Sequence, residues 1–499
     1  MSEELSEETG GRAAEGVTMH GAAEPRGLGA VPRSVMFEGR FGRMFRNLPF
    51  VPNDRNALIM LGSKLPEAVG SDVAEDNPKI PAAYTYLGQF IDHDLTFDPV
   101  SQLQRFNDPD GLHNFRTPRF DLDSVYGRGP SESPYLYEWA DRKWRGVKLL
   151  AGRNPDTDVD GTPLDPQDLP RNEQGRALIG DPRNDENIIV SQLHLAFIKL
   201  HDRLAPSVQR RGFSGPALLE ETARIVRWHY QWMVVHDFLP RVAGQSMVSS
   251  ILKNESSPAG PTVELKFYKW ESDPYMPVEF SAAAYRFGHS MVRPFYDLNR
   301  VVTGVPIFIT DDPPDPFSHL GGFRRLPVGW TVDWSRFVNI GGTRPQLSRR
   351  INTRLAPELG KLPSSIDGAR TALAVLNLRR GKALQLPSGQ AVAERMGVTP
   401  LTTAELGLDK LGLHPEHRAD LEAATPLWFY ILKEAEVREQ GLQLGEVGGR
   451  IVAEVLIGIL SGDPSSYLRV QPTWRPDGSI PAFKAGEFTL GDLLKFATR

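Results

Sequence analysis

Apolar residues recur every three to four positions along much of this 499-residue chain, a spacing that places them on one face of a helix. Alternation with a period of two is weak, and only Thr262–Phe267 and Val305–Ile309 resemble short strands. The helical pattern predicts helices over residues 82–96, 188–206, 215–239, 276–292, 345–358, 367–378, 390–395, 403–409, 414–435 and 446–462. We therefore predict a mainly α fold with very little β structure.

Proline and glycine are spread along the whole chain and are not gathered into one linker. The 41 prolines and 46 glycines interrupt the helices often, which favours long ordered loops between them. We find no internal repeat. The pattern predicts one large helical domain over residues 36–499, with a functional site assembled from segments that are distant in the sequence.

The first 35 residues differ from the rest because they are rich in Glu, Gly and Ala. We expect this segment to be disordered, and it has no apolar core of the kind found in a cleaved secretory leader. Nowhere does the chain approach 18 consecutive apolar residues, so we expect no membrane span. These features predict a cytoplasmic protein, or one that is exported without a cleaved leader.

Charge and cysteine content exclude several classes of function. The formal charge is −5 and the pI is near 6.2, so a concentrated basic face for nucleic acid is not expected. Cysteine is absent, which excludes disulfides, thiolate metal ligands and cysteine nucleophiles.

The most informative segment is Gly88–Asp94, with the sequence Gly-Gln-Phe-Ile-Asp-His-Asp. On the predicted helix Gln89 and His93 are four residues apart and share one face, with Asp92 beside them. Asp94 is rotated by about 100° from His93 and points elsewhere. One face therefore carries an amide, an imidazole and a carboxylate, a set suited to acid–base chemistry. The alternative is a helix end with ordinary polar residues.

The segment Arg116–Gly127 offers hard oxygen ligands at alternating positions. Calcium binds six to eight oxygens from carboxylates, hydroxyls and backbone, and one loop seldom supplies all of them. The alternative is an ordinary turn, since turns are rich in Asp and Ser. The candidate ligands are the side chains of Thr117, Asp121 and Asp123, the carbonyl of Arg119, and Asp94 from the preceding helix.

A third segment, Gly180–Asn187, leads into an apolar helix, and its Asp-Pro pair is a good helix start. Arg183 and Glu186 are three residues apart, so both can face one pocket. The alternative is a carboxylate that favours the helix dipole and a solvated arginine. We interpret His194 and His201, on the helix that follows, as packing histidines.

The segment Phe280–Pro294 combines small residues with a histidine. Alanines and Gly288 allow a flat ligand to approach the chain closely, and His289 on such a face is a candidate axial ligand for haem iron. Arg286, one turn earlier, is placed to reach a haem propionate. The alternative is a core histidine, which is how we interpret His229 and His236 in their Trp-rich helix.

Asn377 interrupts an apolar run, and a buried amide needs hydrogen-bond partners. A histidine that binds a metal usually donates its second N–H to an acceptor, and the side-chain carbonyl of Asn377 is a candidate for that role. The alternative is an asparagine that caps a helix or pins a loop.

Together, in this order and spacing, these segments resemble the animal-type haem peroxidases, the peroxidase–cyclooxygenase superfamily that includes myeloperoxidase. The resemblance covers roughly residues 30–480, and the cysteine-free chain and its segment Leu444–Glu454 are similar to bacterial members. It implies a helical haem-peroxidase domain that binds haem b and calcium. The implied reaction is reduction of hydrogen peroxide and oxidation of small organic donors or halides through a ferryl intermediate.

The resemblance also implies roles for individual residues. His93 corresponds to the distal acid–base histidine, Gln89 to its amide companion and Arg183 to the distal arginine that polarises peroxide. His289 corresponds to the proximal iron ligand, with Asn377 as its hydrogen-bond partner. The other implied positions are Arg286 and Arg380 at the propionates, Asp92 and Glu186 at ester bonds to haem, and Asp94, Thr117, Arg119, Asp121 and Asp123 at calcium.

The chain departs from the family pattern in two places. Asn187 stands where myeloperoxidase has a methionine that links to haem through sulfur, so no sulfonium bond can form here. This argues against strong halide oxidation, and against chloride oxidation above all. Asp123 stands where the mammalian enzymes have serine, and its added charge favours cation binding.

Two alternative functions remain open at this stage. Fatty-acid dioxygenases on the same scaffold place a radical-forming tyrosine three residues before the proximal histidine, but here that position is Arg286 and Tyr285 lies four before. The second alternative is a haem-free, calcium-binding helical interaction protein, which the intact catalytic positions argue against.

Overall fold

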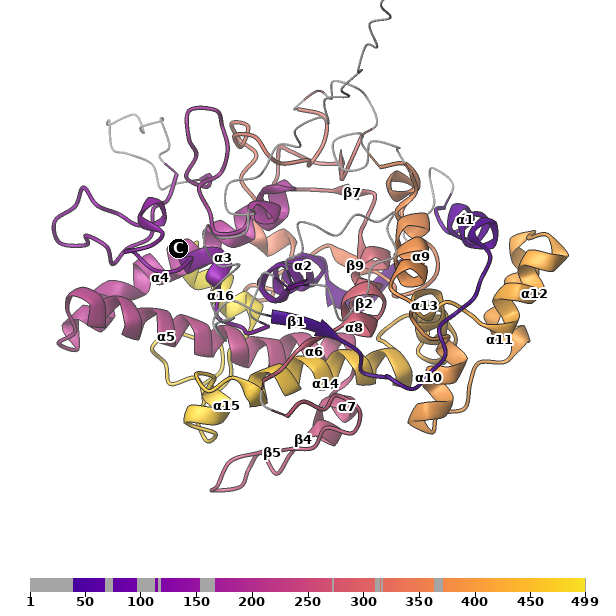
Figure 1. Ribbon diagram of the computed structural model, residues 1–499. Coiled ribbons are helices and arrows are strands. Elements are labelled where there is room, and N and C mark those ends of the chain that lie inside the picture. Colours follow the sequence, from indigo (N-terminus) through magenta and orange to yellow (C-terminus); the bar gives the residue numbers. More distant parts are fainter. Residues whose placement is uncertain are drawn as a thin grey trace, which may run out of the picture.

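The computed structural model describes residues 39–67, 75–96, 113–114, 118–152, 167–271, 273–309, 315, 317–362 and 371–498. The N-terminal segment 1–35, for which we predicted disorder, lies outside these residues. The fold is mainly helical (Figure 1), which confirms the predicted fold class. None of the helices in the described ranges is long and apolar enough to cross a membrane.

The longest helices surround one short central helix. They are α4 (Ile188–Arg210), α5 (Gly215–Met233) and α14 (Glu446–Gly462), and the central helix is α2 (Ala83–Leu95). In Figure 1, α2 lies in the middle of the molecule, with α5 and α14 running across its lower side. Helix α2 packs directly on α4 and on the 3-10 helix η7 (Ala284–Met291).

The remaining helices are shorter. They are α1 (Arg55–Ser63), α3 (Asp123–Tyr126), η4 (Pro134–Leu136), η5 (Pro182–Asp185), the π-helical turn η6 (Val234–Phe238), α6 (Leu239–Val242), α7 (Gln245–Ile251), α8 (Val278–Ala282), η8 (Trp334–Arg336), η9 (Pro357–Gly360), α9 (Leu373–Ala383), α10 (Gly389–Met396), α11 (Thr403–Leu406), η10 (Leu408–Leu411), α12 (Pro415–Ala423), α13 (Leu427–Arg438), α15 (Tyr467–Val470) and α16 (Leu490–Ala497).

The β structure consists of small pairings between short strands. They are β1 (Gly39–Gly42), β2 (Asp76–Pro81), β3 (His113–Asn114), β4 (Leu252–Lys253), β5 (Thr262–Val263), β6 (Met276–Pro277), β7 (Phe295–Tyr296), β8 (Val305–Pro306) and β9 (Leu347–Arg349). Strand β1 pairs antiparallel with β3 and parallel with β6, while β2–β9, β4–β5 and β7–β8 are antiparallel pairs. These pairs tie distant segments together and do not form a layer of their own.

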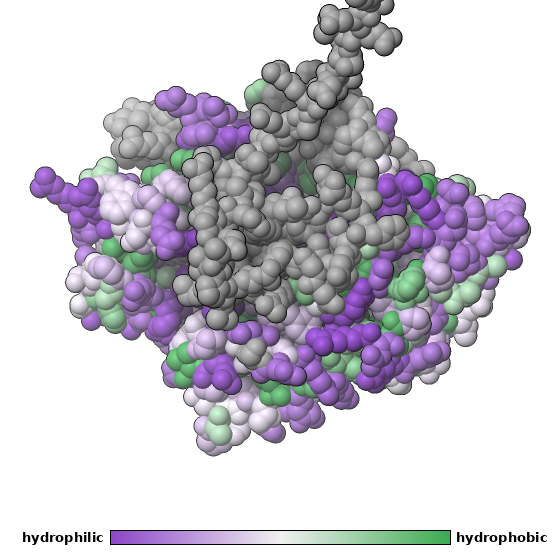
Figure 2. All heavy atoms as spheres, viewed as in Figure 1, coloured by the Kyte–Doolittle hydropathy of each residue, from purple (hydrophilic) through white to green (hydrophobic). Residues whose placement is uncertain are grey.

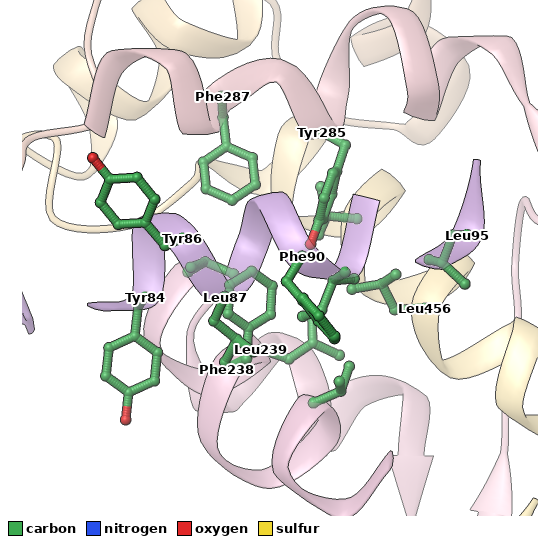
Figure 3. Packing of buried hydrophobic residues seen from close by; sticks show 14 of the residues in the cluster. Tyr84, Tyr86, Leu87, Phe90, Leu95, Phe238, Leu239, Tyr285, Phe287 and Leu456 are labelled. Carbon is green, nitrogen blue, oxygen red and sulfur yellow. The ribbon is translucent and has the colours of Figure 1, made fainter. Parts of the chain in front are cut away.

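Aromatic packing holds α2 in the core. Phe90 is fully buried and stacks on Phe197 of α4, with ring centroids 4.6 Å apart. Figure 3 shows Phe287 and Tyr285 of η7 on one side of α2 and Phe238 with Leu239 on the other. Because α2 is enclosed from both directions, the polar residues on its remaining face are held at defined positions.

The part of the described surface that is visible in Figure 2 is ordinary for a folded domain. On the face seen in Figure 2, its residues are mostly hydrophilic, and hydrophobic ones are scattered among them. Scattered apolar residues of this kind are normal on protein surfaces.

The predicted helix over 345–358 is wrong. Residues Leu347–Arg349 form strand β9 against β2, and only Pro357–Gly360 turn helically. Arg349 donates to Glu67 at 2.5 Å, and Asn352 donates to the Glu75 carboxylate at 2.7 Å. These long-range pairings, which no local pattern records, override the helical spacing.

Other predicted helices exist with different boundaries. The helix over 276–292 is interrupted at Ala283, whose φ of −133° and ψ of −72° are not helical, and the chain continues as the 3-10 helix η7. The helix over 414–435 divides into α12 and α13 before Pro426, because proline cannot continue the first helix. The helix over 188–206 extends to Arg210, since Pro206 is tolerated within α4.

The predicted strand Thr262–Phe267 is paired only over its first two residues. The backbone N–H groups of Lys266, Phe267 and Tyr268 donate to the buried Glu454 carboxylate at 2.8 to 3.1 Å. These donors are therefore satisfied without a sheet. Similarly, the strand expected at Val305–Ile309 pairs only at Val305–Pro306.

Candidate active site

A cavity of about 390 Å³ lies between α2 and η7. One wall comes from α2 and η5, and the opposite wall comes from η7. Apolar side chains that follow these elements, such as Phe308 and Leu373, complete the lining. The cavity brings together residues from seven separate stretches of the chain and falls within the size range of small-molecule sites.

The α2 wall carries Gln89, Asp92 and His93. His93 is 5% exposed, and its Nδ1 lies 2.8 Å from the side-chain oxygen of Asn184. Burial, together with the nearby Arg183 cation, lowers the pKa of His93 to about 4. The imidazole is therefore neutral near pH 7 and able to accept a proton.

Arg183 connects η5 to the end of α2. Asp181 caps η5 by accepting the Arg183 backbone N–H, and its carboxylate also pairs with the Arg183 guanidinium at 2.7 Å. The same Nη2 donates to the His93 carbonyl at 3.1 Å and contacts the carbonyl of Thr96. A cation is thus held beside the cavity histidine by four defined contacts.

Glu186, Gln89 and Asn187 form a linked group on the same wall. Gln89 Nε2 contacts Glu186 Oε1, and Asn187 donates to Gln89 Oε1 at 3.1 Å. Burial raises the pKa of Glu186 to about 7. Asn187 also caps α4 by accepting the Val190 N–H at 2.9 Å, so the helix start and the orientation of Gln89 depend on one side chain.

A glycine behind Glu186 allows this wall to form. The Gly322 N–H donates to the Glu186 carbonyl at 2.9 Å. A Cβ atom at Gly322 would lie 1.8 Å from the Asp185 carbonyl oxygen, so no larger residue can approach in the same way. The close backbone contact supports the loop that presents Arg183 and Glu186.

The η7 wall carries His289, Arg286 and Gly288. Burial, and after it the Arg286 cation, lowers the pKa of His289 to about 3, so this imidazole is neutral too. Its Nδ1 lies 2.8 Å from the side-chain nitrogen of Asn377 on α9. We predicted the Asn377 oxygen as this partner. If a metal is bound at His289 Nε2, the ring carries its proton on Nδ1, and that N–H needs an oxygen acceptor. The Asn377 amide would then have to be turned over, so that its oxygen faces His289 Nδ1.

The two predicted propionate arginines differ in position. Arg286 lines the cavity and donates from Nε to the Ser281 carbonyl at 3.0 Å. Its own carbonyl accepts from Trp428 Nε1 at 3.2 Å. Arg380 lies on α9, three residues after Asn377, and is not among the described residues that line the cavity.

The cavity suits a flat iron porphyrin. Two neutral imidazoles line it, His93 from α2 and His289 from η7, and Arg183 and Arg286 can meet anionic groups. A Cβ atom at Gly288 would have no heavy atom within 4 Å, so this part of the η7 wall faces open space. The donor set is the one that haem iron uses in peroxidases.

A separate acidic cluster lies at the C-terminal end of α2. Ligand oxygens of Asp94, Asp121 and Asp123 lie within 4.8 Å of one another, and Asp94 is fully buried. Thr117 lies outside the described residues. The Arg119 side chain points to Asp463, with Nε 3.9 Å from its carboxylate.

Two residues were not singled out as site residues by the sequence analysis: one contacts His93 and the other lines the cavity. Asn184 lies between Arg183 and Glu186 in the sequence and contacts His93, but asparagine in a turn carries no distinctive signal. Tyr285 lines the cavity, and its buried hydroxyl has no hydrogen-bond partner within the described ranges. The sequence signal that could have identified Tyr285 is its position four residues before His289, the candidate haem ligand.

Comparison with known proteins supports the same interpretation. Similar proteins include a peroxidase-like protein of Margaritifera margaritifera, 26% identical over 410 residues that cover 68% of this chain and 48% of that protein. Eosinophil peroxidase of Mus musculus is 29% identical over 245 residues, which cover 46% of this chain and 30% of the relative. The chain spans about half, or less, of the length of these relatives.

Solved structures show where the fold recurs. Peroxidase A from Dictyostelium discoideum matches with a TM-score of 0.57 and 16% identity, covering 93% of this chain and 94% of that one. The fatty acid alpha-dioxygenase of Oryza sativa matches with a TM-score of 0.55 and 16% identity, covering 91% of this chain and 84% of that one. At this identity the likeness establishes the fold alone.

A family model described as animal haem peroxidase matches residues 103–406, more than half of the chain. This stretch includes η5 with Arg183 and the η7 wall with Arg286 and His289, whereas α2 precedes it. The chain therefore belongs to the animal haem peroxidase family.

Proposed function

We propose that this protein is a haem-dependent peroxidase that reduces hydrogen peroxide and oxidises small organic donors or halides. Family membership supports haem binding and a peroxidase-type reaction. One observation carries the proposal: a single cavity has neutral His93 and cationic Arg183 on one wall and neutral His289 on the other. Each of these groups is suited to one task in peroxide cleavage.

The residues divide the work as follows. A bound haem supplies the iron that activates peroxide and takes up its oxidising equivalents. His289 Nε2 would hold that iron, while Arg286 would bind an anionic substituent of the porphyrin. His93 Nε2 accepts a proton from one peroxide oxygen and returns it to the other, which leaves as water.

The groups around His93 support this proton transfer. Arg183 presents a fixed positive charge where negative charge develops as the O–O bond lengthens. Gln89, held by Asn187 and Glu186, offers an amide for orienting peroxide or water. Because both imidazoles are neutral near pH 7, neither needs to lose a proton before the reaction starts.

The direct test is a visible spectrum of the full chain supplied with haem, recorded before and after hydrogen peroxide, together with peroxide-dependent oxidation of a dye. We expect a Soret band, a spectral change on adding peroxide, and dye turnover. A colourless protein, or a haem protein that does not respond to peroxide, would contradict the proposal.

A fatty-acid dioxygenase is the second candidate, favoured by Tyr285. This tyrosine lines the cavity with a buried hydroxyl, and solved alpha-dioxygenases share the fold. However, fatty-acid dioxygenases have their radical-forming tyrosine three residues before the proximal histidine. In this chain Arg286 occupies that position, and Tyr285 lies four residues before His289. Oxygen uptake with a fatty acid, in the absence of peroxide-dependent dye oxidation, would favour this candidate.

We also propose that Asp92 and Glu186 form ester bonds to haem methyl groups. Each carboxylate oxygen would replace one methyl C–H bond in a two-electron oxidation, for which hydrogen peroxide is the oxidant and is reduced to water. Both carboxyl groups line the cavity on the α2 side, where a porphyrin edge would lie against them. Ester bonds would hold the macrocycle on this wall in addition to the bond from His289.

Replacing both acids, as Asp92→Asn and Glu186→Gln, is expected to release the haem under denaturing extraction. The amides cannot form the esters, so haem should move to the organic phase, whereas wild-type protein should keep it. Glu132→Gln is the matched control, because that side chain is 64% exposed on the surface. Wild-type haem that extracts freely would show that the esters do not form.

We further propose that Asp94, Asp121 and Asp123 bind calcium. Three carboxylates whose oxygens lie within 4.8 Å repel one another in a partly buried setting, and a divalent cation would offset this repulsion. Because Asp94 directly follows His93, the ion would also stabilise the end of α2. Its oxygen-rich chemistry matches calcium better than a transition metal.

Calcium at a hundred times its Kd is expected to stabilise the protein by about 2.7 kcal/mol, because it binds only the folded state. Thermal unfolding with calcium and with a chelator measures this difference. In Asp94→Asn the calcium effect should disappear. Terbium luminescence excited through a nearby tyrosine provides a second readout. Tyr230 is such a tyrosine: its pKa is raised by burial and, after burial, by the Asp94 carboxylate, which must therefore lie close to it. Equal melting temperatures with and without calcium, and no terbium signal, would argue against the site.

A further inference from the structure

Asn184, the third residue of η5, bridges two buried imidazoles. Its side-chain oxygen lies 2.8 Å from His93 Nδ1, and its side-chain nitrogen lies 3.0 Å from His194 Nδ1 on α4. Asn184 is fully buried and His194 is 1% exposed. Sequence analysis assigned His194 to helix packing alone, yet the structure connects it through one amide to the cavity histidine.

The chemistry of an amide restricts where the protons on these rings can be. The oxygen only accepts and the NH₂ group only donates, so in this arrangement His93 carries its proton on Nδ1 and His194 accepts at Nδ1. His93 Nε2, which lies 4.0 Å from Glu186 Oε1 at the cavity, then has a free lone pair. If the amide were turned over, His93 Nδ1 would accept, His194 Nδ1 would donate, and the proton of His93 would lie on Nε2. In that form Nε2 could not accept a proton.

We propose that Asn184 and His194 are positioning residues that hold His93 in the Nδ1–H tautomer, so that Nε2 is the base facing hydroperoxide. The role of Nε2 as a base rests on the proposed function, whereas the tautomer of His93 does not. His194 acts on His93 through Asn184, because a lone pair on His194 Nδ1 selects the amide orientation. The three side chains come from α2, η5 and α4 and meet in the interior, where the low local dielectric strengthens hydrogen bonds.

Nitrogen NMR of the histidine rings tests the tautomer directly. The sample is the full chain with ¹⁵N-labelled histidine, measured without porphyrin and again with diamagnetic zinc protoporphyrin. Two other buried histidines provide internal references. His201 Nε2 faces the Val147 carbonyl at 2.9 Å and must carry a proton there, whereas His229 Nδ1 faces the Ile225 carbonyl at 2.7 Å and must carry its proton on Nδ1.

In the wild type we expect His93 to match the His229 pattern. Asn184→Leu, which removes both hydrogen bonds, should convert His93 to a mixture of tautomers. Asn184→Asp keeps an oxygen acceptor, so His93 should stay Nδ1–H while His194 changes to Nδ1–H. Wild-type His93 in the Nε2–H form, or a His93 signal unchanged in Asn184→Leu, would overturn the proposal.

Kinetics of the haem-loaded protein provide the second readout. Asn184→Leu is expected to slow the reaction with peroxide by roughly 10- to 100-fold, with haem content and the donor KM unchanged. Asn184→Asp should recover most of the rate. If the wild type shows the expected tautomer but no peroxidase activity, the proposed function fails and the tautomer assignment stands. If the wild type is active and Asn184→Leu reacts at the same rate, the positioning role fails.

Discussion

Replacing His289 with glycine is expected to abolish stable haem binding, seen as loss of the Soret band and of haem per chain. His289 is the imidazole on the η7 wall of the cavity, and its partner Asn377 is held in place on α9. Without this ring the iron has no axial nitrogen on that wall. The esters proposed at Asp92 and Glu186 can form only on haem that is already bound, so at first the arginines alone would hold the anionic edge of a porphyrin. The expected loss exceeds that of any other single change proposed for this site.

Added imidazole distinguishes a lost ligand from a misfolded protein. In His289→Gly the removed ring leaves space beside the cavity, so free imidazole should restore the Soret band. The matched control is His414→Gly, because His414 is 65% exposed on the surface and should leave haem content unchanged. A His289→Gly protein with the wild-type spectrum, in the absence of imidazole, would exclude His289 as the iron ligand.

Replacing His93 with alanine is expected to slow the reaction with hydrogen peroxide by about 10²- to 10⁴-fold, the usual contribution of general acid–base catalysis. Haem should remain bound, because His93 lies on the wall opposite His289. Stopped-flow spectra at several peroxide concentrations measure the rate, and the Soret absorbance measures the haem. An unchanged rate with full haem content would remove His93 from the mechanism.

The pH profile provides an independent signature of the same residue. Burial and the Arg183 cation lower the pKa of His93 to about 4. The neutral base is therefore present from neutral pH down to that value, and the rate should fall only as pH drops through about 4, when Nε2 becomes protonated. In His93→Ala this acidic limb should disappear. A limb near pH 6.5 would instead indicate a solvent-exposed histidine.

Local periodicity was sufficient to predict α2, which carries one wall of the site, and the buried helix α14. The helix predicted over 82–96 is α2, Ala83–Leu95, and the helix predicted over 446–462 is α14 with the same bounds. Both are apolar runs without an internal proline. Their boundaries follow from residues within a few positions, so no information from elsewhere in the chain is needed.

Long-range contacts decided the elements that the sequence analysis missed. The region over 345–358 has helical spacing, but carboxylates of Glu67 and Glu75, nearly 300 residues earlier, bind its polar side chains and a strand forms. Helices α1 and α16, for which no prediction was made, are short and pack on α9 and α4. Such choices depend on partners that are distant in the sequence, and a local pattern does not contain them.

By itself the sequence determined which chemical groups are available and their order: a Gln-x-x-Asp-His segment, an arginine before a glutamate, and a histidine followed much later by an asparagine. Residue spacing also determined that Gln89 and His93 share a helix face. Only the tertiary structure decided that these segments surround one cavity, that Arg380 stays off its lining, and that Asn184 joins His93 to His194. The physical reason is that burial, pKa and hydrogen-bond direction depend on distances through space, which exist only once the helices have packed.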